Sequence, residues 1–201
     1  MKNTMKNEVE KKVNTNEIIC TPDFIVDFLY QNIIPKVNKS NGVLKVFNPA
    51  IGKGALTNKL KSDGAYVIGN DIQDVSMHNV QADELYNLDM RTFNMKLEGI
   101  DLAIVNPPFS GCGNKLLYPE VFLDKIFESC GYNTPTIIIT PQGLRFNCSK
   151  SSKRYRKFVE VYNPISSVIC LPKDSFGTLI HCEILVFNVD NIKPTYFLDT
   201  I

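Results

Sequence analysis

The sequence predicts an α/β fold built around one mainly parallel, doubly wound sheet. Short apolar runs of strand length alternate with longer segments of helix length from residue 43 to residue 171. The last apolar run, 182–187, follows the run 165–171 after a short Gly-containing link that has no room for a crossover helix, so it should form an antiparallel hairpin. A chain of 201 residues with 44% hydrophobic content can bury one substantial core but not two.

The expected elements follow in order along the chain. Residues 1–16 are polar and charge-rich and are expected to form a flexible N-terminal arm, with one domain over 17–201. Thr21 as N-cap and Pro22 at the first helical position predict a helix that ends near Ile34. The expected strands are 43–47, 65–70, 87–90, 100–105, 135–140, 165–171 and 182–187. The later expected helices are 74–85, 119–130 and 150–161.

Composition excludes several classes of protein. A formal net charge of +1 argues against a protein that coats nucleic acid indiscriminately. Six cysteines without CxxC spacing and two histidines predict neither a zinc site nor a disulfide framework, so we expect no metal and reduced thiols. No apolar stretch reaches membrane-spanning length and the start lacks a signal peptide's apolar core, so we expect a cytoplasmic protein without a membrane partner.

The tetrapeptide Asn106-Pro107-Pro108-Phe109 follows the apolar run 100–105 and should lie at the carboxyl end of a buried strand. Its two prolines remove two backbone donors and fix two φ angles. The Asn106 side chain and the neighbouring carbonyls are then held rigidly with their acceptors free, which suits a site that grips an amino group. The alternative is a plain Pro-rich turn.

A second motif, Asn48-Pro49-Ala50-Ile51-Gly52-Lys53-Gly54, directly follows the first expected strand and should open a helix that continues through Lys59. Gly52 and Gly54 let the backbone pass close to a ligand, and a helix amino terminus offers free N–H groups to a carboxylate. Asp71 ends the next expected strand, from which a carboxylate can bind ribose hydroxyls. The alternative is a nucleotide-free tight turn and a surface aspartate.

Together these motifs resemble those of S-adenosylmethionine (SAM)-dependent N6-adenine DNA methyltransferases. The tetrapeptide is similar to their Asn/Asp-Pro-Pro-Phe/Tyr motif, and the glycine turn is similar to their motif I, Asp/Asn-Pro-x-x-Gly-x-Gly. Thr21-Pro22 resembles the amino-terminal Thr-Pro segment of the gamma order, in which the cofactor motifs come first. The segment 168–178, followed by 183–187, resembles the end of the catalytic core of type I modification subunits. The likeness covers about residues 17 to 188.

The resemblance implies a Rossmann-like SAM-dependent methyltransferase fold, a mainly parallel seven-stranded sheet with one antiparallel strand near the C-terminus. It also implies that Asn106 Oδ1 and the Pro107 carbonyl accept hydrogen bonds from the adenine amine, and that Phe109 stacks on a flipped base. The alternative for Phe109 is a core aromatic residue that caps the sheet. The implied cofactor-binding residues are Thr21, Pro22, Asn48, Pro49, Ala50, Gly52, Gly54, Asp71, Ile72, Asp89, Met90 and Asn106.

Within that set, Asp89 would bind the cofactor's adenine amine, with Ile72 and Met90 on the two faces of the ring. Asp89 could instead be an ordinary turn residue, and Asp83 takes its place if the third strand is shifted. Asn48 stands where an acid is commoner in the family. Its amide can hydrogen-bond the methionine amino group but supplies no charge.

Two further segments could contact a substrate. Residues 110–115 are polar and Gly-rich, and could order over a substrate or be a solvated connection. A basic cluster with no acid inside it could contact nucleic-acid phosphates or form a solvated helix face; it consists of Arg145, Lys150, Lys153, Arg154, Arg156 and Lys157.

The sequence therefore predicts a SAM-dependent methyltransferase domain that modifies the N6 amine of adenine in DNA. No separate target-recognition domain is expected after the core. Sequence specificity would come from a specificity subunit or another partner, or the enzyme would have little preference, or the chain would be a fragment of a longer protein. The alternatives are methylation of RNA adenine or of a protein glutamine, and a catalytically silent SAM-fold subunit that binds nucleic acid or a partner.

Overall fold

The computed structural model describes residues 19–110, 116–146, 149–177 and 180–199, so the expected arm 1–16 and nearly all of the segment 110–115 lie outside the described residues. Within the described residues, eight strands form one sheet in the order β3-β2-β1-β4-β5-β7-β6-β8. The strands are β1 Lys45–Asn48, β2 Tyr66–Asn70, β3 Glu84–Tyr86, β4 Leu102–Val105, β5 Thr136–Pro141, β6 Ile165–Cys170, β7 Cys182–Phe187 and β8 Thr195–Phe197. Among them β7 alone runs antiparallel to its neighbours, β5 and β6.

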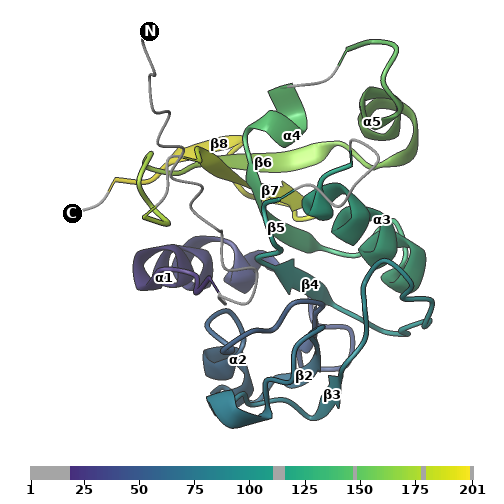
Figure 1. Ribbon diagram of the computed structural model, residues 1–201. Helices are drawn as coiled ribbons and strands as arrows, with labels where there is room; N and C mark the ends of the chain where they lie inside the picture. Colours follow the sequence, from purple (N-terminus) through teal and green to yellow (C-terminus); the bar gives the residue numbers. More distant parts are fainter. Residues whose placement is uncertain (1–18, 111–115, 147–148, 178–179, 200–201) are drawn as a thin grey trace, which may run out of the picture.

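The α-helices are α1 Asp23–Asn32, α2 Asn58–Ser62, α3 Tyr118–Cys130, α4 Gly143–Phe146 and α5 Lys153–Arg156. Successive side chains of the central strands point to opposite faces of the sheet, so each strand contributes residues to both hydrophobic cores. Val46 and Ile104 pack with α1 and α2 on one face, whereas Phe47 and Val105 pack with α3 on the other. Figure 1 shows α1 and α3 on opposite sides of the strands β4 and β5. Both faces of the sheet are covered, as the continuous apolar runs predicted.

The predicted fold class and the late antiparallel hairpin are confirmed, but the sheet has eight strands rather than seven. The additional strand, β8, pairs in parallel with β6 at the sheet edge. The sequence did not indicate β8 because it is only three residues long and its side chains are mostly exposed, so it has no apolar pattern.

The expected helix 74–85 is wrong. A 3₁₀ turn over Ser76–His78 ends at Asn79, which has a left-handed φ of 53°, and β3 follows at Glu84–Tyr86. Val75 is the one buried hydrophobic residue in this stretch, so there is no apolar stripe for a helix to bury. The third strand therefore begins three residues before the expected 87–90.

Other boundaries also differ. The first helix ends at Asn32 and is followed by a 3₁₀ turn over Ile34–Lys36. The expected helix 150–161 is α5 followed by a π-helical turn over Lys157–Val161. The short helix α4, directly after β5, was not expected. In the described residues no helix is both long and apolar enough to cross a bilayer.

Burial controls the reactivity of the described cysteines. It raises the pKa of the Cys130 and Cys182 thiols to about 12, while Cys20 is exposed. At about pH 8 the two buried thiols are almost wholly protonated, and the thiolate is the nucleophile. We expect iodoacetamide to modify Cys20 in the native protein and to spare Cys130 and Cys182, measured by peptide mass spectrometry. Urea-unfolded protein is the control, and equal labelling of all three sites in both states would contradict the burial.

Candidate active site

The carboxyl ends of β1, β2 and β4 lie side by side because these parallel strands are neighbours in the sheet. They end at Asn48, Asn70 and Val105, so the glycine turn, Asp71 and Asn106 all emerge at one edge. Ligand sites of open α/β sheets form at this edge, where the order of strands reverses. The expected motifs are thus brought together by the topology.

Asn106 is joined to the segment that precedes α1. Its Nδ2 donates to Thr21 Oγ1 at 3.1 Å and lies 3.5 Å from the Ile19 carbonyl oxygen, and Thr21 is buried. These bonds fix the orientation of the amide and leave its Oδ1 as the acceptor. Thr21 is therefore not the N-cap that the sequence suggested: Pro22 occupies the cap position, without a side-chain cap bond.

The rest of the tetrapeptide is firmly packed. Pro107 is buried and Pro108 exposed, while Phe109 is 8% exposed within the core cluster on the α1 face. Phe176, which follows β6, meets Phe109 edge-on, with ring centroids 5.3 Å apart. Sequence reasoning gave Phe176 no role. Its signals were its place in the segment 168–178 and its position as an isolated aromatic residue in the polar link between two strands.

The glycine turn folds back on Asp71. Asn48 is buried and its Oδ1 accepts from the Ala50 N–H at 3.2 Å. Gly52 has a φ of 52° and donates its N–H to Asp71 Oδ2 at 2.9 Å. The backbone of the turn and the carboxylate of Asp71 are thus parts of one hydrogen-bonded unit.

Gly54 serves packing within this turn. Its φ is 78°, and a Cβ placed on it would lie 2.1 Å from Asn58 Oδ1. That oxygen accepts from the Gln81 N–H, which ties the segment before β3 to the turn. Helix α2 begins only at Asn58, so the expected helix amino terminus at the two glycines is wrong.

Asp71 presents an oriented carboxylate. Its Oδ1 accepts from the Gln73 N–H at 3.0 Å and its Oδ2 from Gly52, and among the described residues it forms no ion pair with a cation. Ile72 beside it is 61% exposed. A fixed carboxylate with lone pairs remaining, next to an uncovered apolar side chain, suits hydroxyl groups and a flat ring.

Asn70 is a residue that sequence reasoning missed. It is fully buried, and its Nδ2 donates to the carbonyls of Pro49 and Leu88 while its Oδ1 accepts from the Leu88 N–H. One side chain therefore joins the end of β2 to the loops that follow β1 and β3. Its signal was a polar residue at the end of an apolar strand, next to the more conspicuous Asp71.

Asp89 does not end a strand, because β3 stops at Tyr86. Both its oxygens accept from the guanidinium of Arg91, and this bonding holds the pKa of Asp89 below its usual range. Met90 is buried in the α3-face core, so the expected adenine-binding set is only partly open at the surface. Asp83 bonds the Val67 N–H and Lys61 at the amino end of β3, away from the carboxyl edge.

The basic cluster divides into two groups. Arg145 pairs with Glu183, Arg154 with Glu120 at 2.9 Å, and Lys157 with Asp124 and Glu120, so these three cations link α4, α5 and the following turn to β7 and α3. Lys150, Lys153 and Arg156 are exposed. The described residues contain no group of three or more His, Cys, Asp or Glu that could hold a metal ion.

No protein family model matches the sequence, and no curated protein is significantly similar to it. Solved structures do match. A candidate class I SAM-dependent methyltransferase from Listeria monocytogenes superposes with a TM-score of 0.67 and 17% identity over 90% of this chain and 66% of that one. The type I restriction-modification methyltransferase subunit of Streptococcus thermophilus superposes with a TM-score of 0.64 and 16% sequence identity. The superposition covers 88% of this chain and 45% of that one.

The M protein of the type I restriction enzyme EcoKI gives a TM-score of 0.59 with 13% identity, over 87% of this chain and 46% of that one. This chain thus spans less than two thirds of the length of these proteins. At such identities the likeness shows the fold alone. The protein has the fold of the SAM-dependent methyltransferases.

Proposed function

We propose that this protein transfers the methyl group of SAM to the N6 amine of adenine in DNA. The observation that supports this most directly is the hydrogen bond between Asn106 and Thr21. It joins the Thr-Pro segment and the Asn-Pro-Pro-Phe tetrapeptide, 85 residues apart, at the carboxyl edge of the sheet. The bond uses the Asn106 amide as a donor, so Oδ1 is kept for an incoming amine.

The residues at the edge fit SAM. Asp71, held by Gly52 and Gln73, would bind the ribose hydroxyls, and the Asn48 amide would hydrogen-bond the methionine amino group. The exposed Ile72 would cover one face of the adenine ring, and Asp89 would accept from its amine. Pro22, Pro49 and Ala50 would line the same cofactor, whereas Met90 lies buried in the α3-face core. Bound SAM supplies a methyl group that its sulfonium already activates.

The protein's own part in the reaction is to hold the adenine amine. The lone pair of that amine is delocalised into the ring, which makes it a poor nucleophile. When Asn106 Oδ1 and the Pro107 carbonyl accept hydrogen bonds from its two N–H groups, the lone pair would be directed at the methyl group. The amine would gain the methyl group as the S–C bond of the cofactor breaks, and it would release one proton to solvent. In-line alignment needs no strong base, and positioning can contribute roughly 7–11 kcal/mol.

The target base would stack on Phe109. That ring is 8% exposed and meets Phe176 edge-on, so a base would stack on it only after the Phe176 ring moved away. Stacking there would offset part of the few kcal/mol needed to unstack a base from a duplex.

DNA would reach the site along the exposed cations Lys150, Lys153 and Arg156. A specificity subunit would select the sequence, since one similar structure is described as showing complex assembly of the type I restriction-modification system. That structure belongs to another protein, with 17% identity.

The test is transfer of a labelled methyl group from SAM to duplex DNA, single-stranded DNA, RNA and a glutamine-containing peptide in parallel, alongside calorimetric SAM binding. Label in DNA, recovered as N6-methyladenine, supports the proposal. If label appears only in RNA or only in the peptide, the protein is a methyltransferase but the proposed DNA substrate is wrong. Failure to bind SAM would leave the catalytically silent subunit as the better account.

A further inference from the structure

The side chain of Phe146 in α4 is 63% exposed to solvent. A phenylalanine side chain that remains in contact with water forgoes much of the free energy that its burial would supply. It lies five residues beyond the end of β5, so α4 emerges from the same edge of the sheet as Asn106, on the neighbouring strand. The proposed methyl transfer does not use Phe146.

The ring is held from beneath by a guanidinium. The Arg145 Cζ atom lies 4.1 Å from the centroid of the Phe146 ring. Arg145 is fixed in turn by two hydrogen bonds to Glu183, from Nε at 3.1 Å and from a terminal nitrogen at 2.8 Å. A planar cation against one face of an aromatic ring both orients the ring and strengthens stacking on it.

The anchor of this arrangement is a fully buried carboxylate. Glu183 is 0% exposed and lies in β7 between Thr140 of β5 and Cys170 of β6. Burying a carboxylate is costly even when it is paired, and an apolar residue would fill a sheet interior as well. The carboxylate has a clear effect, however: it holds Arg145, and through Arg145 it holds an exposed ring in one orientation.

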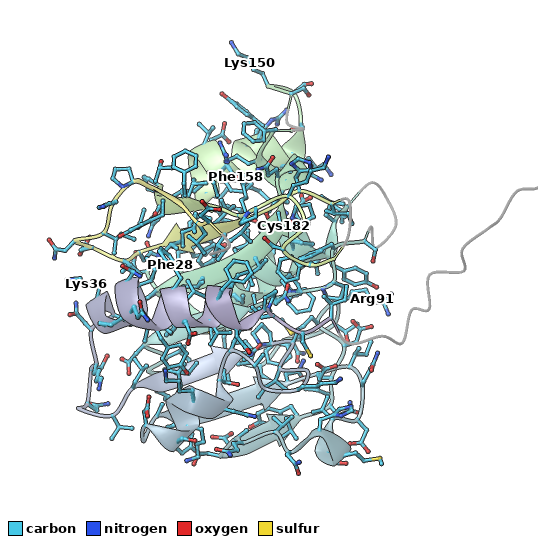
Figure 2. The ribbon with its side chains drawn as sticks, turned by 90° about the vertical axis from the view of Figure 1, so that its left-hand side faces the viewer. Phe28, Lys36, Arg91, Lys150, Phe158 and Cys182 are labelled. Carbon is cyan, nitrogen blue, oxygen red and sulfur yellow. The ribbon has the colours of Figure 1, made fainter. Side chains whose placement is uncertain are left out.

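The charge near the ring suits a polyanion. Arg145 is neutralised by Glu183, but the chain that follows α4 carries Lys150, Lys153 and Arg156, all exposed. Figure 2 shows Lys150 at one extremity of the molecule, extending away from the protein body. In Figure 1 α4 and α5 lie near one another beyond the β5–β6 part of the sheet. An exposed aromatic ring and exposed cations on the segment that follows it are the composition of a single-strand nucleic-acid site.

We infer that Phe146, supported by Arg145 and Glu183, is a stacking platform for an unpaired nucleobase outside the catalytic pocket. The inference rests on the proposed function for its ligand, a nucleic acid. Phe146 would hold a base displaced from the duplex near the target, and the neighbouring cations would contact its phosphates. Arg145 and Glu183 are positioning residues in this arrangement rather than phosphate ligands.

The experiment measures binding of a fluorescent single-stranded oligonucleotide and of its duplex by anisotropy, with no methyl transfer involved. Replacing Phe146→Ala should weaken single-strand binding by about five- to one-hundred-fold, the range typical for loss of one base–aromatic stack. Phe146→Tyr and Phe146→Trp should restore it, because both keep an aromatic face. Phe197→Ala in β8 is the matched control, since Phe197 is even more exposed but lies at the lateral sheet edge.

Arg145→Lys keeps the charge but cannot form the planar stack, so it should weaken single-strand binding with little effect on SAM binding. Equal affinity of wild type and Phe146→Ala for single strands would overturn the inference while leaving methyl transfer intact, and would point to a protein partner over the ring. Absence of any nucleic-acid binding by the wild type would also overturn it. Methyl transfer to a peptide would then show separately that the DNA substrate was wrong.

Discussion

Asn106→Ala is expected to lower the rate constant for methyl transfer by about 10²–10³, the loss typical when one preorganised polar group of an active site is removed. The alanine removes the Oδ1 acceptor for the adenine amine and also the Nδ2 bond to Thr21. The affinity for SAM should change much less, because Asp71 and the glycine turn remain in place. Single-turnover kinetics with labelled SAM measure the rate constant, and calorimetry measures the affinity.

Two matched variants separate the acceptor from the bond that orients it. Asn106→Asp keeps an acceptor oxygen that can take a hydrogen bond from the Thr21 hydroxyl, so it should retain more activity than the alanine variant. Thr21→Val keeps the side-chain shape but removes the bond to Asn106, and we expect a loss of about tenfold, the equivalent of one ordinary hydrogen bond or slightly more. If Asn106→Ala keeps its rate within about threefold of wild type, the tetrapeptide does not hold the amine and the proposed reaction is wrong.

The central sheet could be predicted because strands that are buried on both faces consist of continuous apolar residues, a pattern that is visible in the sequence. Leu102–Val105 and Thr136–Pro141 are continuous apolar or β-branched runs between turn residues, which is typical of buried parallel strands. The antiparallel pairing of β6 and β7 could be predicted from the short length of the link between them alone. The carboxyl-edge location of Asn48, Asp71 and Asn106 then followed from topology.

The cofactor-side loops were predicted less well because local hydrogen bonds decide them. Glu84–Tyr86 is a three-residue strand with no buried side chain, so nothing distinguished it from the residues around it. Asp89 was expected at the end of the third strand. Its position instead depends on its bond to Arg91 and on the loop that Asn70 holds in place. Interactions of that kind depend on side-chain partners that sequence periodicity does not reveal.

The basic cluster shows the same limit over longer separations. Six cations without an intervening acid gave no sign that three of them pair with acids elsewhere in the chain. Arg145 and Glu183 are 38 residues apart and meet only because β5 and β7 are paired. The distinction between cations paired with acids and cations exposed at the surface required the fold.

Arg145→Met should destabilise the protein by about 3 kcal/mol, near the low end of the range for breaking a buried ion pair, because the Arg145 side chain is 33% exposed. Glu183 would be left in the sheet interior without its bidentate partner. Arg154→Met is a matched comparison. Its partner Glu120 still has Lys157 at 3.7 Å, so this variant should lose less stability than Arg145→Met. Urea unfolding followed by circular dichroism measures both, with the slope of the transition checked for two-state behaviour.

The double variant Arg145→Met with Glu183→Leu identifies which loss matters. Removing both partners leaves no unpaired buried charge, so most of the stability should return. The guanidinium under Phe146 stays absent, however, and single-strand binding should remain weak. If stability recovers and single-strand binding does not, the role of the Arg145–Glu183 pair is to orient the Phe146 ring rather than to stabilise the fold. If instead the double variant is as unstable as the single one, the Arg145 stem contributes packing, and the buried charge has no special cost.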